Sequence, residues 1–268
     1  MNRQSQAAVL FLLGAALLHA GTTDLYLRYV KAGLQPLLLA SGAVLIVAAL
    51  ATAWYEWRRG KSEREEHEKH ENRETHGLRE EGEKHEDQET HQERERHGAH
   101  PEPRISWLLV LPLLALILVA PPALGSYSAT RTGTALQEPL AYPALPATDP
   151  LPLGLVDYAG RAVYDHGRTL EGRTVRLTGF IALDHDGTPY LVRMALNCCA
   201  ADAQPVKVAL TGAIPPVLQP DTWLTVTGTY TPRSTRDPVN NGPIPYLKIT
   251  AATPTPEPRD PYDESYNN

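Results

Sequence analysis

Three apolar stretches dominate the first half of the chain, whereas the second half alternates apolar with polar positions. The stretches are residues 7–23, 36–57 and 105–125, and each is nearly free of charge. A bilayer core about 30 Å thick needs roughly 20 helical residues, so we predict three transmembrane helices. The first stretch also has the length of a signal peptide, but Leu18 stands where a cleavage site needs a small residue. We therefore expect residues 1–57 to provide two retained membrane helices.

A highly charged segment separates the second apolar stretch from the third. Residues 58–104 contain 11 Lys/Arg and 15 Asp/Glu residues and few apolar ones, which is too little to build a core. Acidic residues often stand four positions before a basic residue or a histidine, a spacing that supports an isolated helix. We expect a cytoplasmic loop that is largely disordered or forms a fluctuating helix.

Basic residues near the ends of the apolar stretches predict their orientation. Cytoplasmic ends of membrane helices carry an excess of Lys and Arg. Such residues stand before the first stretch, after the second and before the third: Arg3, Arg58, Arg59, Lys61 and Arg104. With three spans, the N-terminus is cytoplasmic and the chain after residue 126 is extracytoplasmic. The protein is predicted to be a multi-pass protein of the cell membrane.

The second half of the chain has the pattern of a small β domain. Residues 126–152 are rich in Ala, Pro and Thr and predict a tether, and a short amphipathic helix follows at 155–164. Runs of β-branched and aromatic residues, separated by turn residues, then predict five strands: 174–183, 189–196, 205–210, 223–230 and 246–251. Residues 153–252 form the expected domain, and the Pro- and Asp-rich tail 253–268 is expected to be disordered.

Five strands in such a short segment favour a closed architecture. Gly179 and Gly228 fall inside two of the predicted strands, where a small barrel has to bend sharply. The predicted fold class is therefore membrane α, with three transmembrane helices, plus an extracytoplasmic all-β domain that forms a five-stranded OB-like barrel. A simple β-sandwich is the alternative.

The charge of the second half argues against a nucleic-acid partner. Residues 126–268 contain 11 Lys/Arg against 14 Asp/Glu residues, so the domain lacks the basic footprint that nucleic-acid binding requires. Its predicted extracytoplasmic location also argues against a nucleic-acid partner. The same location permits disulfide bonds.

Both cysteines of the chain, Cys198 and Cys199, are adjacent at the end of a predicted strand. A disulfide between neighbours is strained, because their Cα atoms lie about 3.8 Å apart whereas disulfides usually need roughly 4.4–6.8 Å. The pair is therefore a labile redox switch, a two-thiolate metal ligand, or two small packing residues. As a metal site, the thiolates and Asp202 would supply three ligands to zinc or another transition metal. Water, His166, His185 or a partner would complete it.

Histidines in the charged segment form a second candidate metal site. Imidazole suits zinc, copper and nickel, and two pairs are spaced to share a helix face: His67 with His70, and His97 with His100. The spacing defines no closed site, so we expect weak, exchangeable binding. The alternative is a variable linker whose histidines have no role.

Several motifs resemble those of the YcgQ-like family of bacterial membrane proteins. They are Asp157-Tyr158, Gly172-Arg-Thr-Val-Arg-Leu-Thr-Gly179-Phe180, Arg193, Asn197-Cys-Cys-Ala-Ala-Asp202 and Asp221-Thr-Trp223. The Cys-Cys-Ala-Ala-Asp motif is the most specific of them, and the apolar segments and the histidine-rich loop also match. The resemblance implies a subunit that acts beside a larger polytopic permease, with a link to zinc supply in some members. It also implies that Arg193 lies near the cysteine site.

These features predict a non-enzymatic accessory subunit, whose β domain presents a metal or another small ligand outside the membrane. A thiol-disulfide enzyme is less favoured, because the chain has no Cys-x-x-Cys motif. A hydrolase would need a nucleophile motif that is also missing. The alternatives are an extracytoplasmic thiol-redox switch and a membrane-anchored interaction module.

Overall fold

The computed structural model describes residues 3–77, 114 and 122–264. The chain divides into two compact units. One contains Met1–His19 and Leu38–Ala120, and the other contains Ala20–Leu37 and Pro121–Asn268. Most of the predicted third membrane span and much of the charged loop lie outside the described residues.

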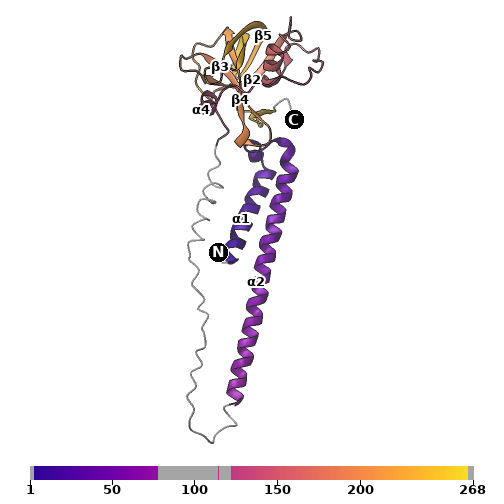
Figure 1. Cartoon of the computed structure of the whole chain (residues 1–268), viewed down its shortest axis with the longest axis vertical. Helices are drawn as coiled ribbons and strands as arrows, with labels where there is room; N and C mark the ends of the chain where they lie inside the picture. The colour runs from indigo at the N-terminus through magenta and orange to yellow at the C-terminus, as the bar shows by residue number, and fades with distance from the viewer. Residues whose placement is uncertain (1–2, 78–113, 115–121, 265–268) are drawn as a thin grey trace. The chain divides into compact units, whose positions relative to one another are not determined.

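Two long helices, each with an apolar segment, make up most of the described part of the first unit (Figure 1). Helix α1 spans Arg3–Thr22 and α2 spans Gln35–Gly77. Two segments, Ser5–Thr22 and Ala32–Lys61, are long and apolar enough to cross a membrane; the first lies in α1, and the second begins just before α2. Two of the predicted spans are therefore apolar helices of the right length, and the count of three stays a prediction.

Glycines allow α1 and α2 to pack closely. A Cβ atom on Gly14 would lie 2.9 Å from the carbonyl oxygen of Gly42, and one on Gly42 would lie 2.9 Å from Leu18 Cγ. Both distances are shorter than van der Waals contact. Small residues commonly permit such close packing between membrane helices.

The segment between the two helices belongs to the second unit. This interhelical connector, residues 23–34, contains two short 3₁₀ helices, η1 (Asp24–Arg28) and η2 (Ala32–Leu34). Tyr26 and Leu27 are buried, so the connector is anchored by apolar side chains.

Five strands form a closed β-barrel in the second unit (Figure 1). They pair in the order β2-β3-β4-β6-β5 and back to β2; every pairing is antiparallel except β4 with β6. Their bounds are Thr174–Leu183 (β2), Pro189–Leu196 (β3), Gln204–Gly212 (β4), Trp223–Arg236 (β5) and Pro243–Pro254 (β6). The predicted five-stranded barrel is confirmed, and the alternative of an open sandwich is wrong.

Side chains of the strands are buried on both faces of part of the barrel. In β3, Leu191 packs in the interior, whereas its neighbours Tyr190 and Val192 join a second apolar cluster. This division follows from the two-residue period of a strand. Helix α5 (Leu155–Val163) contributes Leu155 to the interior cluster.

The glycines inside the strands stand where the backbones approach most closely. A Cβ atom on Gly228 would lie 2.5 Å from the carbonyl oxygen of Lys248, and one on Gly179 would lie 2.7 Å from that of Val192. The register of β5 against β6 also shifts between Thr227 and Gly228. The register shift at Gly228 agrees with the bend predicted there, whereas the bend at Gly179 stays a prediction.

The segment predicted as a loose tether is packed against the barrel instead. Helix α4 (Ser126–Arg131) buries Ala129 in the second apolar cluster, which also contains Tyr190 and Val192. Strand β1 (Leu151–Pro152) pairs with β2. The amide of the buried Thr134 donates to Asp237 Oδ2 over 2.9 Å. Barrel side chains therefore accept from backbone amides at Ser126 and Thr134 and hold these parts of the segment in place.

An ion pair is buried in the same region. Lys207 Nζ lies 2.7 Å from Asp237 Oδ2, and the two side chains are 4% and 0% exposed. Burial alone would raise the pKa of Asp237, but hydrogen bonds from Lys207 and from the amides of Val239 and Thr134 hold it below its usual value. The pair fixes the β5–β6 turn to β4.

The expected disorder of the tail is also wrong over part of its length. Strand β7 (Tyr262–Glu264) pairs in parallel with the end of β3. Tyr262 is buried, and Arg193 donates to its carbonyl oxygen over 2.6 Å. Tertiary contacts thus order a segment whose local sequence has no strand pattern.

Candidate functional site

The two cysteines lie on the turn that joins β3 to β4. This cysteine loop, residues 197–203, leaves β3 after Leu196 and contains the 3₁₀ helix η4 (Ala200–Asp202) before β4 begins. Cys198 is exposed, Cys199 is half-buried, and neither forms a disulfide. Neither side chain is fully buried, and the choice among metal ligand, redox switch and packing residue stays a prediction.

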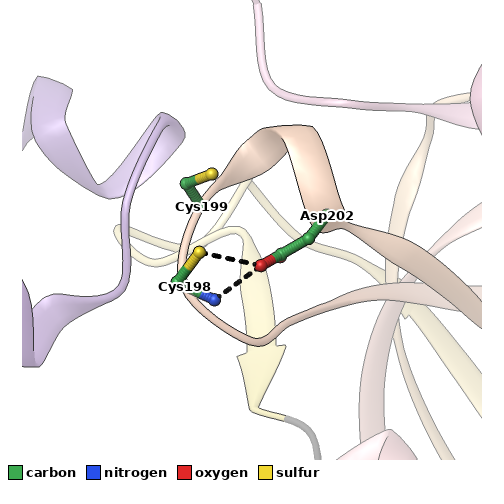
Figure 2. Close-up of side chains that lie close together, drawn as sticks. All are labelled: Cys198, Cys199 and Asp202. Carbon is green, nitrogen blue, oxygen red and sulfur yellow. Dashed lines mark hydrogen bonds between the residues drawn. The ribbon is translucent and has the colours of Figure 1, made fainter.

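Asp202 organises the cysteine loop (Figure 2). Its Oδ2 atom accepts hydrogen bonds from the amide of Cys198 and from Cys198 Sγ, both over 2.9 Å, and its Oδ1 atom accepts from the amide of Asn197 over 3.1 Å. A carboxylate that accepts several local amides stabilises a tight turn. The same contacts place a thiol directly against a carboxylate.

This contact shifts both pKa values in opposite directions. The hydrogen bond to Asp202 is the main cause that raises the pKa of Cys198 to about 11, and Cys199 adds to it. Burial would raise the pKa of Asp202, but hydrogen bonds from the Cys198 thiol and from nearby amides hold it below its usual value. At neutral pH, Cys198 is therefore a protonated thiol that donates to a carboxylate.

The three side chains form a possible metal site. One ligand atom from each of Cys198, Cys199 and Asp202 lies within 4.8 Å of the others. In a tetrahedral zinc site with Zn–S bonds of about 2.3 Å, ligand atoms are roughly 3.5–3.8 Å apart. For one ion to replace the thiol protons, the most widely separated ligand atoms would have to approach by about 1 Å, and Cys198 Sγ and Asp202 Oδ2, now 2.9 Å apart, would have to separate slightly.

Removal of the Asp202 carboxylate should make Cys198 more reactive. In reduced, metal-free full-length protein, Asp202→Asn should return the pKa of Cys198 toward its ordinary value of about 8.5. In the variant, a larger fraction of Cys198 is thiolate at pH 8, although each thiolate is a weaker nucleophile because its pKa is lower. The first effect is larger, so alkylation of Cys198 should accelerate about tenfold. Peptide mass spectrometry would measure the rate. Asp186→Asn, in the β2–β3 turn, is the control and should leave it unchanged; equal rates in both variants would contradict the assignment.

The cysteine loop is paired with the interhelical connector. Val30 and Cys199 form an antiparallel β-bridge, in which Lys31 N donates to Cys198 O over 3.1 Å and Ala200 N donates to Tyr29 O over 2.7 Å. Figure 2 shows the connector passing beside the cysteines. The candidate site therefore lies against the segment that joins the two apolar helices.

The other predicted site residues have different positions. Arg193 does not contact the cysteines in any described interaction; it donates to the carbonyls of Asp260 and Tyr262 and lies over the ring of Trp223. His166 and His185, proposed as further ligands, do not belong to the described cluster.

The histidines of the charged segment cannot be placed in a site. His67 and His70 lie in the helical range of α2, but their side chains are not among those described. His97 and His100 lie outside the described residues. Metal binding by these four histidines stays a prediction.

Two elements of the site could not be found from the sequence. They are the backbone of Tyr29–Lys31, which bonds to the cysteine loop through main-chain atoms, and the strand β7, which pairs with the end of β3. Both lie far from the cysteines along the chain. Main-chain hydrogen bonds leave no residue signature. Arg193 is a basic residue inside a predicted strand, which indicates a polar partner. That partner is the carbonyl oxygen of Tyr262 in β7.

Residues 158–263 match the family model described as the DUF1980 C-terminal domain. The match covers the barrel, the cysteine loop and most of β7, so the domain extends past the predicted boundary at residue 252. No curated protein and no solved structure matches the chain. The family is uncharacterised, and both the YcgQ-like resemblance and the permease role remain proposals.

Proposed function

We propose that this protein is a non-enzymatic accessory subunit of a bacterial permease, whose barrel presents a transition-metal site outside the cell membrane. The observation that carries the proposal is the convergence of two thiols and a carboxylate within 4.8 Å. Zinc is the leading candidate, because thiolates and carboxylates both suit a borderline-soft ion. The three ligands leave a position for water or for a ligand from the permease.

The strand order of the barrel supports its assignment to the OB-like class. Numbered along the chain, the five barrel strands pair as first-second-third-fifth-fourth and back to the first. This is the Greek-key order of a five-stranded OB barrel. Members of that class bind ligands on the face of their second and third strands and through the loops that follow the first and fourth strands. The cysteine loop joins the second strand to the third, so it is not one of those loops.

The contact between connector and barrel supports an odd number of further membrane crossings. If α1 and α2 span the bilayer, the connector emerges on one side, and the barrel pairs with it there. Helix α2 carries the chain to the other side, so it has to cross back before residue 122. The apolar stretch 105–125 supplies that crossing.

Charges near α2 orient this arrangement. Arg58, Arg59 and Lys61 follow the apolar part of α2 at the end remote from the connector. An excess of basic residues marks the cytoplasmic end of a span. The connector, the cysteine loop and the barrel are then extracytoplasmic, where a permease partner and incoming ions are both accessible.

Co-purification with metal analysis tests this function. Full-length protein and its Cys198→Ala/Cys199→Ala variant would be isolated from solubilised bacterial membranes and analysed for metals and for bound proteins. We expect a polytopic membrane protein with both forms, and a transition metal whose amount falls in the variant. Equal metal in both forms would exclude the cysteine site, and absence of a polytopic partner would exclude the accessory role.

The two alternatives predict other results. A thiol-redox switch would be isolated two hydrogens lighter and without metal, and mild reductant would restore the mass. A purely structural interaction module would retain its protein partner but bind no metal in either form.

A further inference from the structure

The connector holds the backbone on both sides of Cys199. The Cys198 carbonyl accepts from the Lys31 amide and the Ala200 amide donates to the Tyr29 carbonyl. The loop carbonyl and amide that flank Cys199 are thus satisfied by the connector. The position of that cysteine relative to Cys198 depends on a segment about 170 residues earlier in the chain.

Further contacts attach the connector to the same side of the barrel. Tyr262 of β7 donates through its hydroxyl group to the carbonyl oxygen of Arg28 over 3.1 Å. The exposed ion pair between Asp24 and Arg259 adds a weak contact. Because Tyr26 and Leu27 are also buried, the connector is a fixed surface and not a free loop.

A fixed surface beside an exposed loop lowers the entropic cost of binding an ion there. The ligand atoms lie within 4.8 Å of one another, and the most widely separated of them have to approach by about 1 Å. A loop with a fixed backbone needs only side-chain movement, whereas a free loop loses conformational entropy as well. Backbone pairing therefore favours binding.

We propose that the interhelical connector is part of the metal site, so that metal binding at the cysteines and docking of the connector stabilise each other. This proposal rests on the proposed function, because it requires that the cysteine loop binds a transition metal. Coupling between two equilibria is reciprocal: docking raises metal affinity, and metal slows undocking. Since the connector continues into α1 and α2, occupancy of the site is transmitted to the ends of both apolar helices.

A substitution of Lys31 isolates one contact. Lys31→Pro removes the amide that donates to Cys198, and the backbone tolerates it because Lys31 has φ −59° and Val30 is bridged in an extended conformation. Lys31→Ala removes the same side chain but keeps the amide, so it is the matched control.

Cobalt titration of reduced full-length protein measures the effect. The thiolate-to-Co²⁺ charge-transfer absorption reports only ions bound by cysteine and ignores those bound by the histidine-rich segment. We expect Lys31→Pro to weaken Co²⁺ binding about threefold to tenfold, as the loss of one hydrogen bond predicts, and Lys31→Ala to match the wild type. Equal affinity in all three proteins would overturn the proposal and leave the metal site intact.

Hydrogen exchange of the wild-type protein provides a second test that needs no substitution in the connector. Saturating Co²⁺ should slow amide exchange in residues 24–34, and Cys198→Ala/Cys199→Ala should abolish this effect. Bound metal with unchanged exchange in the connector would overturn the coupling alone. Absence of the thiolate absorption in wild-type protein would overturn the proposed function and, with it, this inference.

Discussion

Replacement of Asp237 by alanine should lower the free energy of unfolding of the barrel by about 3–5 kcal/mol. The substitution leaves the ammonium group of Lys207, only 4% exposed, without its partner. It also removes the acceptor for the amides of Thr134 and Val239. Denaturant unfolding of the full-length protein, followed by tryptophan fluorescence, would measure the loss.

Two further variants test whether the loss of stability comes from the unpaired charge of Lys207 and not from substitution of a carboxylate in general. Glu257→Ala removes an exposed carboxylate and should change stability by less than about 0.5 kcal/mol. The double variant Lys207→Met/Asp237→Asn removes both charges and keeps an acceptor oxygen, so it should recover most of the loss. If Asp237→Ala and Glu257→Ala were equally stable, the buried pair would not fix the β5–β6 turn.

The same carboxylate should affect acid stability. Because the pKa of Asp237 is lowered in the folded state, its contribution is present above the unfolded pKa of about 3.9 and is lost as the pH falls through the folded pKa. Lys207→Met/Asp237→Asn should therefore lose less stability than the wild type below about pH 4.

Cys198→Ala/Cys199→Ala should weaken binding of one equivalent of Zn²⁺ at least about 100-fold, since even loss of a residue that supports a ligand costs 10–100-fold. His185→Ala, in the exposed β2–β3 turn, is the matched control and should leave affinity within about twofold, because His185 lies outside the cluster. Competition titration against a metal indicator would measure both. Similar affinities in wild type and double variant would assign the binding to other residues.

The pH dependence of binding follows from the thiol protons. Cys198 is protonated at neutral pH, because its hydrogen bond to Asp202 raises its pKa to about 11. Ligation has to displace that proton, because cysteine binds a metal as the thiolate. Affinity should therefore rise with pH between about pH 6 and 8, by roughly tenfold to 100-fold per unit, with release of one to two protons per ion.

The elements that the sequence predicted are those with a local pattern. The bounds of β2 and β3 agree with the predicted runs, and α5 begins at the predicted residue, because alternation and amphipathic spacing depend on neighbouring residues. Strand β7 and the packing of residues 126–152 depend on distant partners such as Arg193 and Asp237. No window of sequence contains both members of those contacts.

The candidate site divides in the same way. Cys198, Cys199 and Asp202 could be grouped from the sequence because a turn of five residues contains all three. The direct thiol–carboxylate contact and the bridge from Val30 to Cys199 needed the tertiary structure. The bridge connects the barrel to the segment between the two apolar helices.

X-ray absorption of the full-length protein loaded with one equivalent of Zn²⁺ tests the central claim most directly. The metal site described above predicts two sulfur ligands at about 2.3 Å and oxygen ligands at about 2.0–2.2 Å. Cys198→Ala/Cys199→Ala should lose the sulfur shell. A wild-type spectrum with only nitrogen and oxygen ligands would contradict a metal site at Cys198 and Cys199.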